Sequence, residues 1–156
     1  MSPESVATIS ASLVDLDATF LPVAQMRQIT RVTALDGLHI AAEVALGAEH
    51  WVYAQHFPED PIFPGTLMIE AAGQLVALWA WTRGLRGRPR LVRTSAAFHA
   101  PVDVAAPRLE LDAEVRGKRH LQFGTVELRA QGRHVATIDI VLAVLPTDQR
   151  PPSTST

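Results

Sequence analysis

The chain has 156 residues, of which 47% are hydrophobic and 19% are charged, and its formal net charge at pH 7 is −2. This length fits one domain, and a slight negative charge argues against a general nucleic-acid binder, which needs a broad excess of positive charge. The sequence contains no cysteine. Disulfides, thiolate metal ligands and cysteine nucleophiles are therefore excluded, and any chemistry must come from histidines, carboxylates or hydroxyls.

Residues 1–22 are predicted to form an N-terminal extension. The first twenty residues contain three acidic residues and no basic one, so they lack the positive start of a secretion signal. No part of the sequence reaches the long apolar run that a membrane span requires. We therefore expect a cytoplasmic protein that does not cross a membrane.

Two strand-like runs follow, at residues 25–35 and 38–46. Asp36 and Gly37 lie between them and form a turn signal that suits a hairpin. The stretch at residues 56–65 contains three prolines, which fix φ and disfavour helix in the residues before them. This stretch is predicted to be an ordered loop.

One helix is predicted, starting at Thr66 and running for about eighteen residues, with Gly84 placed to end it. The run is apolar nearly all round, which is typical of a helix inside a protein. Only Glu70 and Gln74 interrupt it before Thr82, and their i, i+4 spacing places them on the same face.

Four more strand-like runs follow, and residues 109–115 alternate apolar and polar as in a sheet with one covered face. They lie at residues 90–102, 108–117, 121–131 and 134–145. Residues 146–156 are polar and rich in Pro, Ser and Thr, and we expect a disordered tail. The order predicts one α+β domain at residues 23–145, in which a single antiparallel sheet wraps around one long buried helix, as in the hotdog fold.

The residues that can carry chemistry are concentrated at positions 55–77. His56 lies on the proline-stiffened loop, Gly65 at the start of the helix, and Glu70 one turn into it. A carboxyl among apolar neighbours is favoured in its protonated form, as a general acid requires, whereas a histidine titrates near neutrality and suits a general base. The free amide at the helix start can stabilise a developing oxyanion.

This segment resembles the bacterial fatty-acid 3-hydroxyacyl-ACP dehydratases, whose signature has the form G-H-F-P-x-x-P-[IV]-x-P-G-[VT]-L-x-x-E-A-x-[AG]-Q. The matching positions are His56-Phe57-Pro58, Pro61-Ile62, Pro64-Gly65, Leu67, Glu70-Ala71 and Gln74. Weaker similarity covers roughly residues 25–145.

The resemblance implies dehydration of a 3-hydroxyacyl thioester to a trans-2-enoyl thioester, with no metal and no organic cofactor. On this reading His56 removes the C2 proton, Glu70 protonates the departing C3 hydroxyl and the Gly65 amide holds the thioester oxygen. Gln74 orients Glu70. The biosynthesis of an acyl chain or a polyketide is the implied setting.

The resemblance also implies a homodimer, sometimes a trimer of dimers, in which His56 of one subunit faces Glu70 of the other. The substrate arrives on the phosphopantetheine arm of acyl carrier protein, and its acyl chain occupies a tunnel beside the helix. Predicted substrate-binding residues are Gln74, Phe57, Phe63, Pro64 and Phe98, with core packing as the alternative for the three phenylalanines.

Five of the fourteen basic residues lie between Arg83 and Arg93. Arg83, Arg86 and Arg88 are predicted to dock the acidic carrier protein. The alternative is that this segment is only a solvated turn.

The chain departs from the signature at Gln55, where the family usually has glycine, and at His99, where it usually has arginine or lysine. Residues 104–106 replace a Pro-Gly-Asp turn. None of these changes removes a catalytic group, so they indicate a divergent member with an altered substrate or partner.

Two other functions remain open. One is thioester hydrolysis on the same fold, with a carboxylate that activates water. The other is a non-catalytic acyl-binding subunit that pairs with a related chain in a heterodimer. A metal site formed by His50, His56 and Glu59 or Asp60 is the weakest alternative, because no regular element fixes their geometry.

Overall fold

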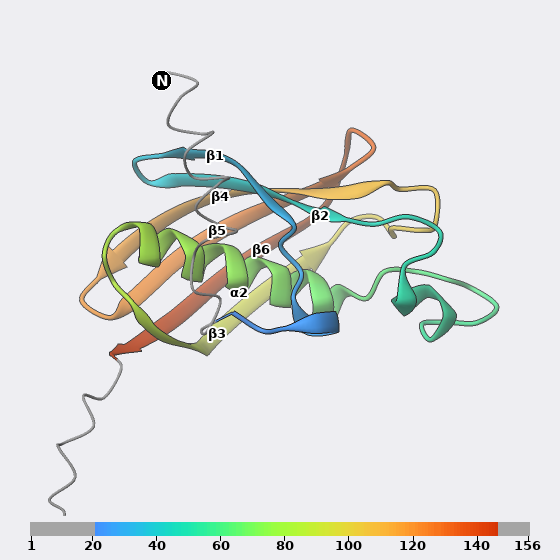
Figure 1. The fold of residues 1–156 in the computed structure, drawn as a ribbon. Helices are drawn as coiled ribbons and strands as arrows, with labels where there is room; N and C mark the ends of the chain where they lie inside the picture. Colours follow the sequence, from blue (N-terminus) through green and yellow to red (C-terminus); the bar gives the residue numbers. More distant parts are fainter. Residues whose placement is uncertain (1–20, 147–156) are drawn as a thin grey trace, which may run out of the picture.

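The computed structural model describes residues 21–146, and it consists of one antiparallel sheet with a single long helix, α2 (Gly65–Thr82), along one face (Figure 1). The sheet has six strands in the order β1-β2-β4-β5-β6-β3. Their bounds are β1 (Arg31–Asp36), β2 (His39–Ala45), β3 (Gly87–Phe98), β4 (Arg108–Lys118), β5 (Leu121–Ala130) and β6 (Arg133–Pro146). The α+β architecture predicted from the sequence is confirmed.

Helix α2 is buried on most of its circumference, as its all-round apolar composition predicts. Trp79 and Trp81 are 4% and 5% exposed and belong to the core near the end of the helix. The helix ends at Thr82, and Gly84, two residues later, turns the chain with a φ of +86° that is readily adopted only by glycine. No helix in the described part of the chain is long and apolar enough to cross a bilayer.

The strands bury one face against α2. On β4, Leu109, Leu111, Ala113 and Val115 are buried while the residues between them are exposed, which is the period of two expected for a half-covered sheet. Gly37 has a φ of +53° in the turn that joins β1 to β2, so the hairpin signal is confirmed.

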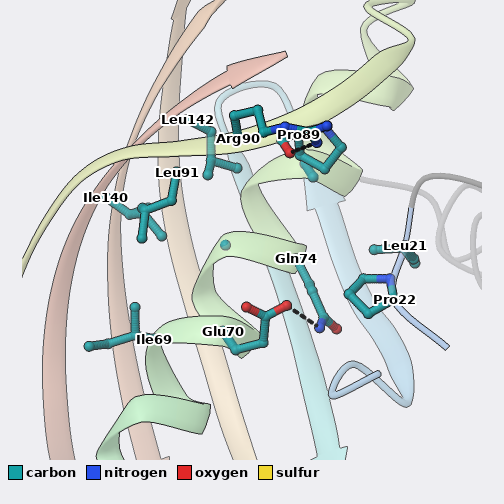
Figure 2. Close-up of a pocket in the computed structure, with 12 residues that line it drawn as sticks. Leu21, Pro22, Ile69, Glu70, Gln74, Pro89, Arg90, Leu91, Ile140 and Leu142 are labelled. Carbon is teal, nitrogen blue, oxygen red and sulfur yellow. Dashed lines mark hydrogen bonds between the residues drawn. The ribbon is translucent and has the colours of Figure 1, made fainter. Parts of the chain in front are cut away.

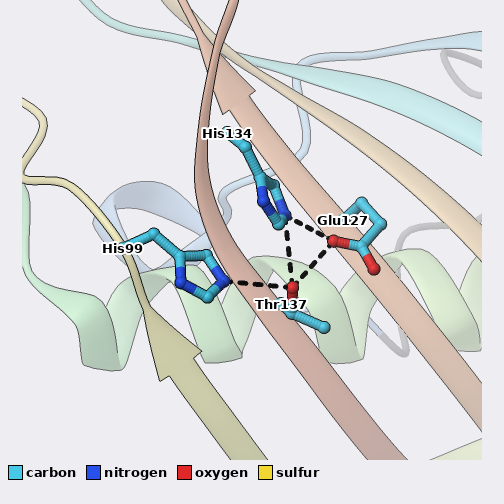
Figure 3. A network of polar contacts seen from close by, with 4 residues as sticks. All are labelled: His99, Glu127, His134 and Thr137. Atoms are coloured by element: carbon cyan, nitrogen blue, oxygen red, sulfur yellow. Dashed lines mark hydrogen bonds and ion pairs between the residues drawn. The ribbon is translucent and has the colours of Figure 1, made fainter.

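The outer face of the sheet, away from α2, carries a polar network (Figure 3). Thr137 on β6 donates to Glu127 on β5 at 2.8 Å, and the His134 and His99 rings lie against the same threonine hydroxyl at 3.2 and 3.3 Å. Burial by itself raises the pKa of the Glu127 carboxyl, but hydrogen bonds from Thr137 and His134 and the charge of both imidazoles offset it and leave the pKa lowered. The network ties β5 to β6 and to the end of β3.

Three predicted boundaries differ from the structure. Residues 25–30 are not strand: a 3-10 turn, η2 (Ala24–Met26), opens this segment, and β1 begins only at Arg31. A second 3-10 turn, η3 (Trp51–Ala54), was not predicted. Strand β3 begins at Gly87 and includes Pro89, which an edge strand tolerates because one side of its backbone has no partner.

Strands β1 and β3 form the two edges of the sheet. β1 has only 6 residues and its pairing is interrupted by a register shift near Thr33, features that protect an edge from further pairing. β3 has 12 residues and exposes Leu91 and Val92, at 55% and 57%. The β3 edge is therefore the one open to another strand.

Candidate active site

A cavity of about 290 Å³ lies between α2 and the first residues of β3, with Glu70 in its wall (Figure 2). Glu70 is partly exposed in the single chain. Apolar side chains of α2, β3 and β6 form most of the lining, and Leu21 and Pro22 close the opposite side. The full lining is Leu21, Pro22, Ile69, Glu70, Gly73, Gln74, Ala77, Pro89, Arg90, Leu91, Ile140 and Leu142.

Gln74 fixes one oxygen of the Glu70 carboxyl. Its amide nitrogen donates to Glu70 Oε1 at 3.0 Å and to the Met26 carbonyl at 2.8 Å. Its amide oxygen accepts from the backbone N–H groups of Gln28 and Ile29 at 2.8 and 3.2 Å. These contacts use both donors and both lone pairs of the Gln74 amide, so it holds Glu70 and has no polar group left for a substrate.

Because Glu70 Oε1 already accepts from Gln74, the proton of a neutral Glu70 is favoured on Oε2, the oxygen without this donor. A protonated Glu70 would therefore carry its donor on one defined oxygen, Oε2. This arrangement is what a general acid beside an apolar cavity requires.

His56 lies on the loop before α2, between η3 and the helix. Its Nδ1 lies 3.1 Å from the Ile62 carbonyl oxygen, which can only accept, so Nδ1 carries the proton. Nε2 is then left with a free lone pair, as a general base requires. The ring stacks on Phe57 with 4.1 Å between centroids.

The loop that carries His56 is held by η3 and its cap. His50 Nδ1 accepts from the Val52 N–H at 3.2 Å, and the His56 N–H donates to the Val52 carbonyl at 2.8 Å. Burial lowers the pKa of His50, which keeps the imidazole neutral and able to accept. Tyr53 donates to the Asp103 carbonyl at 3.1 Å, and burial together with the charge of Asp103 raises the Tyr53 pKa.

Gly65 is the first residue of α2, and within residues 21–146 its N–H has no hydrogen-bond partner. A Cβ at this position would lie 2.7 Å from Cζ of Phe98, so only glycine allows the Phe98 ring to lie over the start of the helix. Phe98 is 50% exposed. Its exposed ring and the free amide are next to each other.

The structure brings some of the predicted residues together and separates others. Glu70 and Gln74 line the cavity, whereas His56, Gly65 and Phe98 of the same chain do not. Phe63 is 3% exposed and packs edge-on to the His50 ring, so the core alternative holds for it. Phe57 is exposed beside His56, and Pro64 is the N-cap residue of α2.

Arg83 differs from the other two predicted docking residues. Its guanidinium donates to the Gly37 carbonyl at 2.8 Å and lies 5.1 Å from the centroid of the Trp79 ring. It therefore ties the end of α2 to the β1–β2 turn. Arg86 and Arg88 are exposed and remain candidates for docking a partner.

Sequence reasoning missed the residues before β1. Leu21 and Pro22, which the prediction placed in an N-terminal extension, line the cavity, and the Met26–Ile29 backbone holds Gln74. The sequence signals for this contact are the polar Gln74 in a nearly apolar helix and the two glutamines, Gln25 and Gln28, in the segment before β1. No group of three or more potential metal ligands occurs among the described residues.

Comparison with known proteins identifies the family to which this architecture belongs. Residues 21–139 match the FabA-like domain family. The chain belongs to this family. As a FabA-like domain it has the hotdog fold, and the match begins at Leu21, the first residue of the cavity wall.

Solved structures similar to this FabA-like domain include proteins with different activities in their names. The dehydratase heterocomplex ApeI:P from Xenorhabdus doucetiae aligns with a TM-score of 0.67 at 16% identity over 81% of this chain and 88% of that one. AziG from S. sahachiroi gives a TM-score of 0.58 at 24% identity, covering 74% and 90%. A hypothetical thioesterase with coenzyme A from Streptococcus pneumoniae gives 0.59 at 14% identity, covering 74% and 84%. At these identities the likeness concerns the fold.

Proposed function

We propose that this protein dehydrates 3-hydroxyacyl thioesters, delivered on acyl carrier protein, to trans-2-enoyl thioesters. The observation that carries the proposal is the Glu70 carboxyl in the wall of an apolar cavity, with Oε1 held by Gln74. His56 supplies a base whose Nε2 is free, and the Gly65 amide supplies an unpaired donor.

The proposed reaction is an elimination. His56 Nε2 takes the C2 proton while the Gly65 N–H stabilises negative charge on the thioester oxygen. The C3–O bond then breaks as Glu70 Oε2 gives its proton to the leaving hydroxyl. A C2–C3 double bond forms, and the C3 hydroxyl leaves as water. The C2 proton is now on His56 and the Glu70 proton is in the water, so the elimination needs no cofactor.

The pairing of His56 with Glu70 is proposed to occur between two copies of the chain. The cavity is walled by Pro89, Arg90 and Leu91 at the start of β3, while Phe98 at the end of β3 lies over Gly65. Antiparallel pairing of two β3 edges brings the start of one strand to the end of the other. The cavity of one copy then lies beside the helix start and the His56 loop of its partner.

The exposed β3 edge supports such an assembly, and the neighbour from Xenorhabdus doucetiae is named as a heterocomplex. We propose a homodimer, with a related chain as the alternative partner. In this dimer Arg86 and Arg88, near the start of β3, lie beside the partner's active-site loop, where an acidic carrier protein would deliver the substrate.

Thioester hydrolysis is the second candidate. Glu70 lines the cavity of the single chain without His56, and a carboxylate alone can activate water. One structural neighbour is named as a hypothetical thioesterase. The two functions differ in their products, because hydrolysis releases a free thiol whereas dehydration removes one water and keeps the thioester.

The test uses 3-hydroxyacyl carrier protein and mass spectrometry. The expected result is loss of one water from the substrate. His56→Ala and Glu70→Gln should each lower the rate of this loss on the order of 10²–10⁴-fold. His134→Ala, which removes a histidine from the outer face of the sheet, is the matched control and should retain full activity. Release of a free thiol without an enoyl product would show that the protein hydrolyses the thioester and does not dehydrate it.

Mixing the two inactive variants tests the shared site. A mixed dimer has one site with both His56 and Glu70 intact, so re-equilibrated equal amounts should recover roughly a quarter of wild-type activity per chain. No recovery, with mixed dimers shown by native mass spectrometry, would place both residues of each site in one chain.

A further inference from the structure

The floor of the Glu70 cavity is a row of α2 residues one turn apart. Ile69, Gly73 and Ala77 all line the cavity, and their i, i+4 spacing places them in a line along the helix. Ile140 and Leu142 of β6 form the wall opposite Gly73. The middle of the floor is thus the one position in this row without a side chain.

Neither the backbone nor the packing explains this glycine. Glycine is among the least favourable residues in a helix interior, and Gly73 has ordinary helical φ rather than a positive value. A Cβ at position 73 would lie 3.4 Å from Ile140 Cδ1 and 3.9 Å from Leu142 Cδ2, which is ordinary van der Waals contact. Alanine therefore fits here and is the better helix former.

What the missing Cβ provides is space. Both side chains that such a Cβ would touch are cavity walls, so any side chain at position 73 would occupy the cavity at its midpoint. The cavity extends along α2 from Glu70 to Ala77, a rise of about 10 Å for a helix. A chain anchored at Glu70 must cross Gly73 to reach the far half.

We propose that Gly73 is a specificity-determining residue that allows acyl chains of medium length to extend past the middle of the cavity. The proposal rests on the proposed function for the reaction at the Glu70 end. With about 290 Å³, the cavity is near the lower limit of ligand pockets, roughly 300 Å³, which favours medium chains over long ones. Short chains end before Gly73 and do not depend on it.

The test measures binding of saturated butanoyl-, octanoyl- and dodecanoyl-pantetheine, which cannot be dehydrated, by calorimetry. Each methylene kept out of an apolar site weakens binding by roughly fourfold. Gly73→Val should therefore weaken octanoyl binding by at least about tenfold, with Gly73→Ala intermediate, while butanoyl binding changes less than about twofold. Thr82→Val, on the same helix but outside the cavity, is the matched control and should keep the wild-type profile.

Gly73→Ala should also raise the thermal midpoint, because it removes a glycine from a helix at a position where alanine fits. A lower midpoint would show that packing or backbone requires glycine and would overturn the inference. Equal weakening of all three ligands, or no weakening of any, would overturn it as well.

The same variants are then assayed with 3-hydroxybutanoyl- and 3-hydroxyoctanoyl-pantetheine. If the wild type binds acyl chains with the expected length profile but removes no water, the proposed function fails and the role of Gly73 stands. If water is lost and the length profile of Gly73→Val equals that of the wild type, the role of Gly73 fails and the proposed function stands.

Discussion

Replacing Gln74 by methionine removes the support of Glu70 with little change in side-chain volume. Gln74 is 4% exposed and makes three hydrogen bonds to the backbone of residues 26–29 and one to Glu70. A hydrogen bond contributes about 0.5–1.5 kcal/mol net, so losing the three backbone bonds should destabilise the fold by about 3 kcal/mol. For a chain of this size that corresponds to a thermal midpoint lowered by about 6–12 °C.

The Gln74→Met substitution should also lower the rate, because the Glu70 carboxyl loses the donor that fixes its Oε1. A displacement of about 1 Å of a catalytic group can cost about 10²-fold in rate. We therefore expect kcat for dehydration to fall by about tenfold to a hundredfold at a temperature where the variant is folded. Thermal melts and kinetics are run at one protein concentration, because dimer stability depends on it.

Gln28 offers a matched control. It is also 4% exposed, and its side chain donates to the carbonyls of Gln25 and Met26 without reaching Glu70. Gln28→Met should lower the midpoint but keep kcat near that of the wild type. A folded Gln74→Met protein with wild-type kcat would refute the orienting role, and one with a wild-type midpoint would refute the role of Gln74 in stability.

Three further predictions concern pH, assembly and docking. Burial lowers the His50 pKa, so the stability it contributes is present above its ordinary pKa of 6.5 and is lost as pH falls through the lowered value; His50→Asn keeps a capping oxygen and should flatten the fall of the thermal midpoint with acid. Val92→Lys puts a charge on the β3 edge and should shift sedimentation from dimer towards monomer and lower activity in parallel, whereas Val104→Lys, an equivalent change at another exposed valine, should do neither. Charge reversal of Arg86 and Arg88 together should raise KM for carrier-bound substrate and reduce its salt dependence but leave pantetheine substrates unaffected; equal effects on both substrates would rule out docking.

The elements that the sequence predicts well are those with strong local patterns. The sequence predicts helix α2 within one residue of its observed start because its run from Leu67 on is apolar except at Glu70 and Gln74, and Gly84 follows it. The paired strands β4 and β5 were equally clear, because β4 alternates and both are bounded by turns. In each case neighbouring residues are enough to decide the structure.

The segment before β1 could not be predicted in this way. Its conformation depends on hydrogen bonds to Gln74, which lies 45 to 48 residues later in the chain. The residues that can act as acid, base and oxyanion donor were found from the signature, but their arrangement was not. That the Glu70 cavity excludes His56 of the same chain follows from the course of the loop and of β3, which no local pattern encodes.

The bonds between Gln74 and residues 26–29 link Glu70 to the part of the chain that precedes the sheet's first hairpin. Residues 23–27 of this segment are exposed, so it is expected to detach at lower urea concentrations than those that unfold the sheet and helix. Circular dichroism would then change little while turnover is already lost. An enzyme of this design would be inactivated by a local opening well before it denatures.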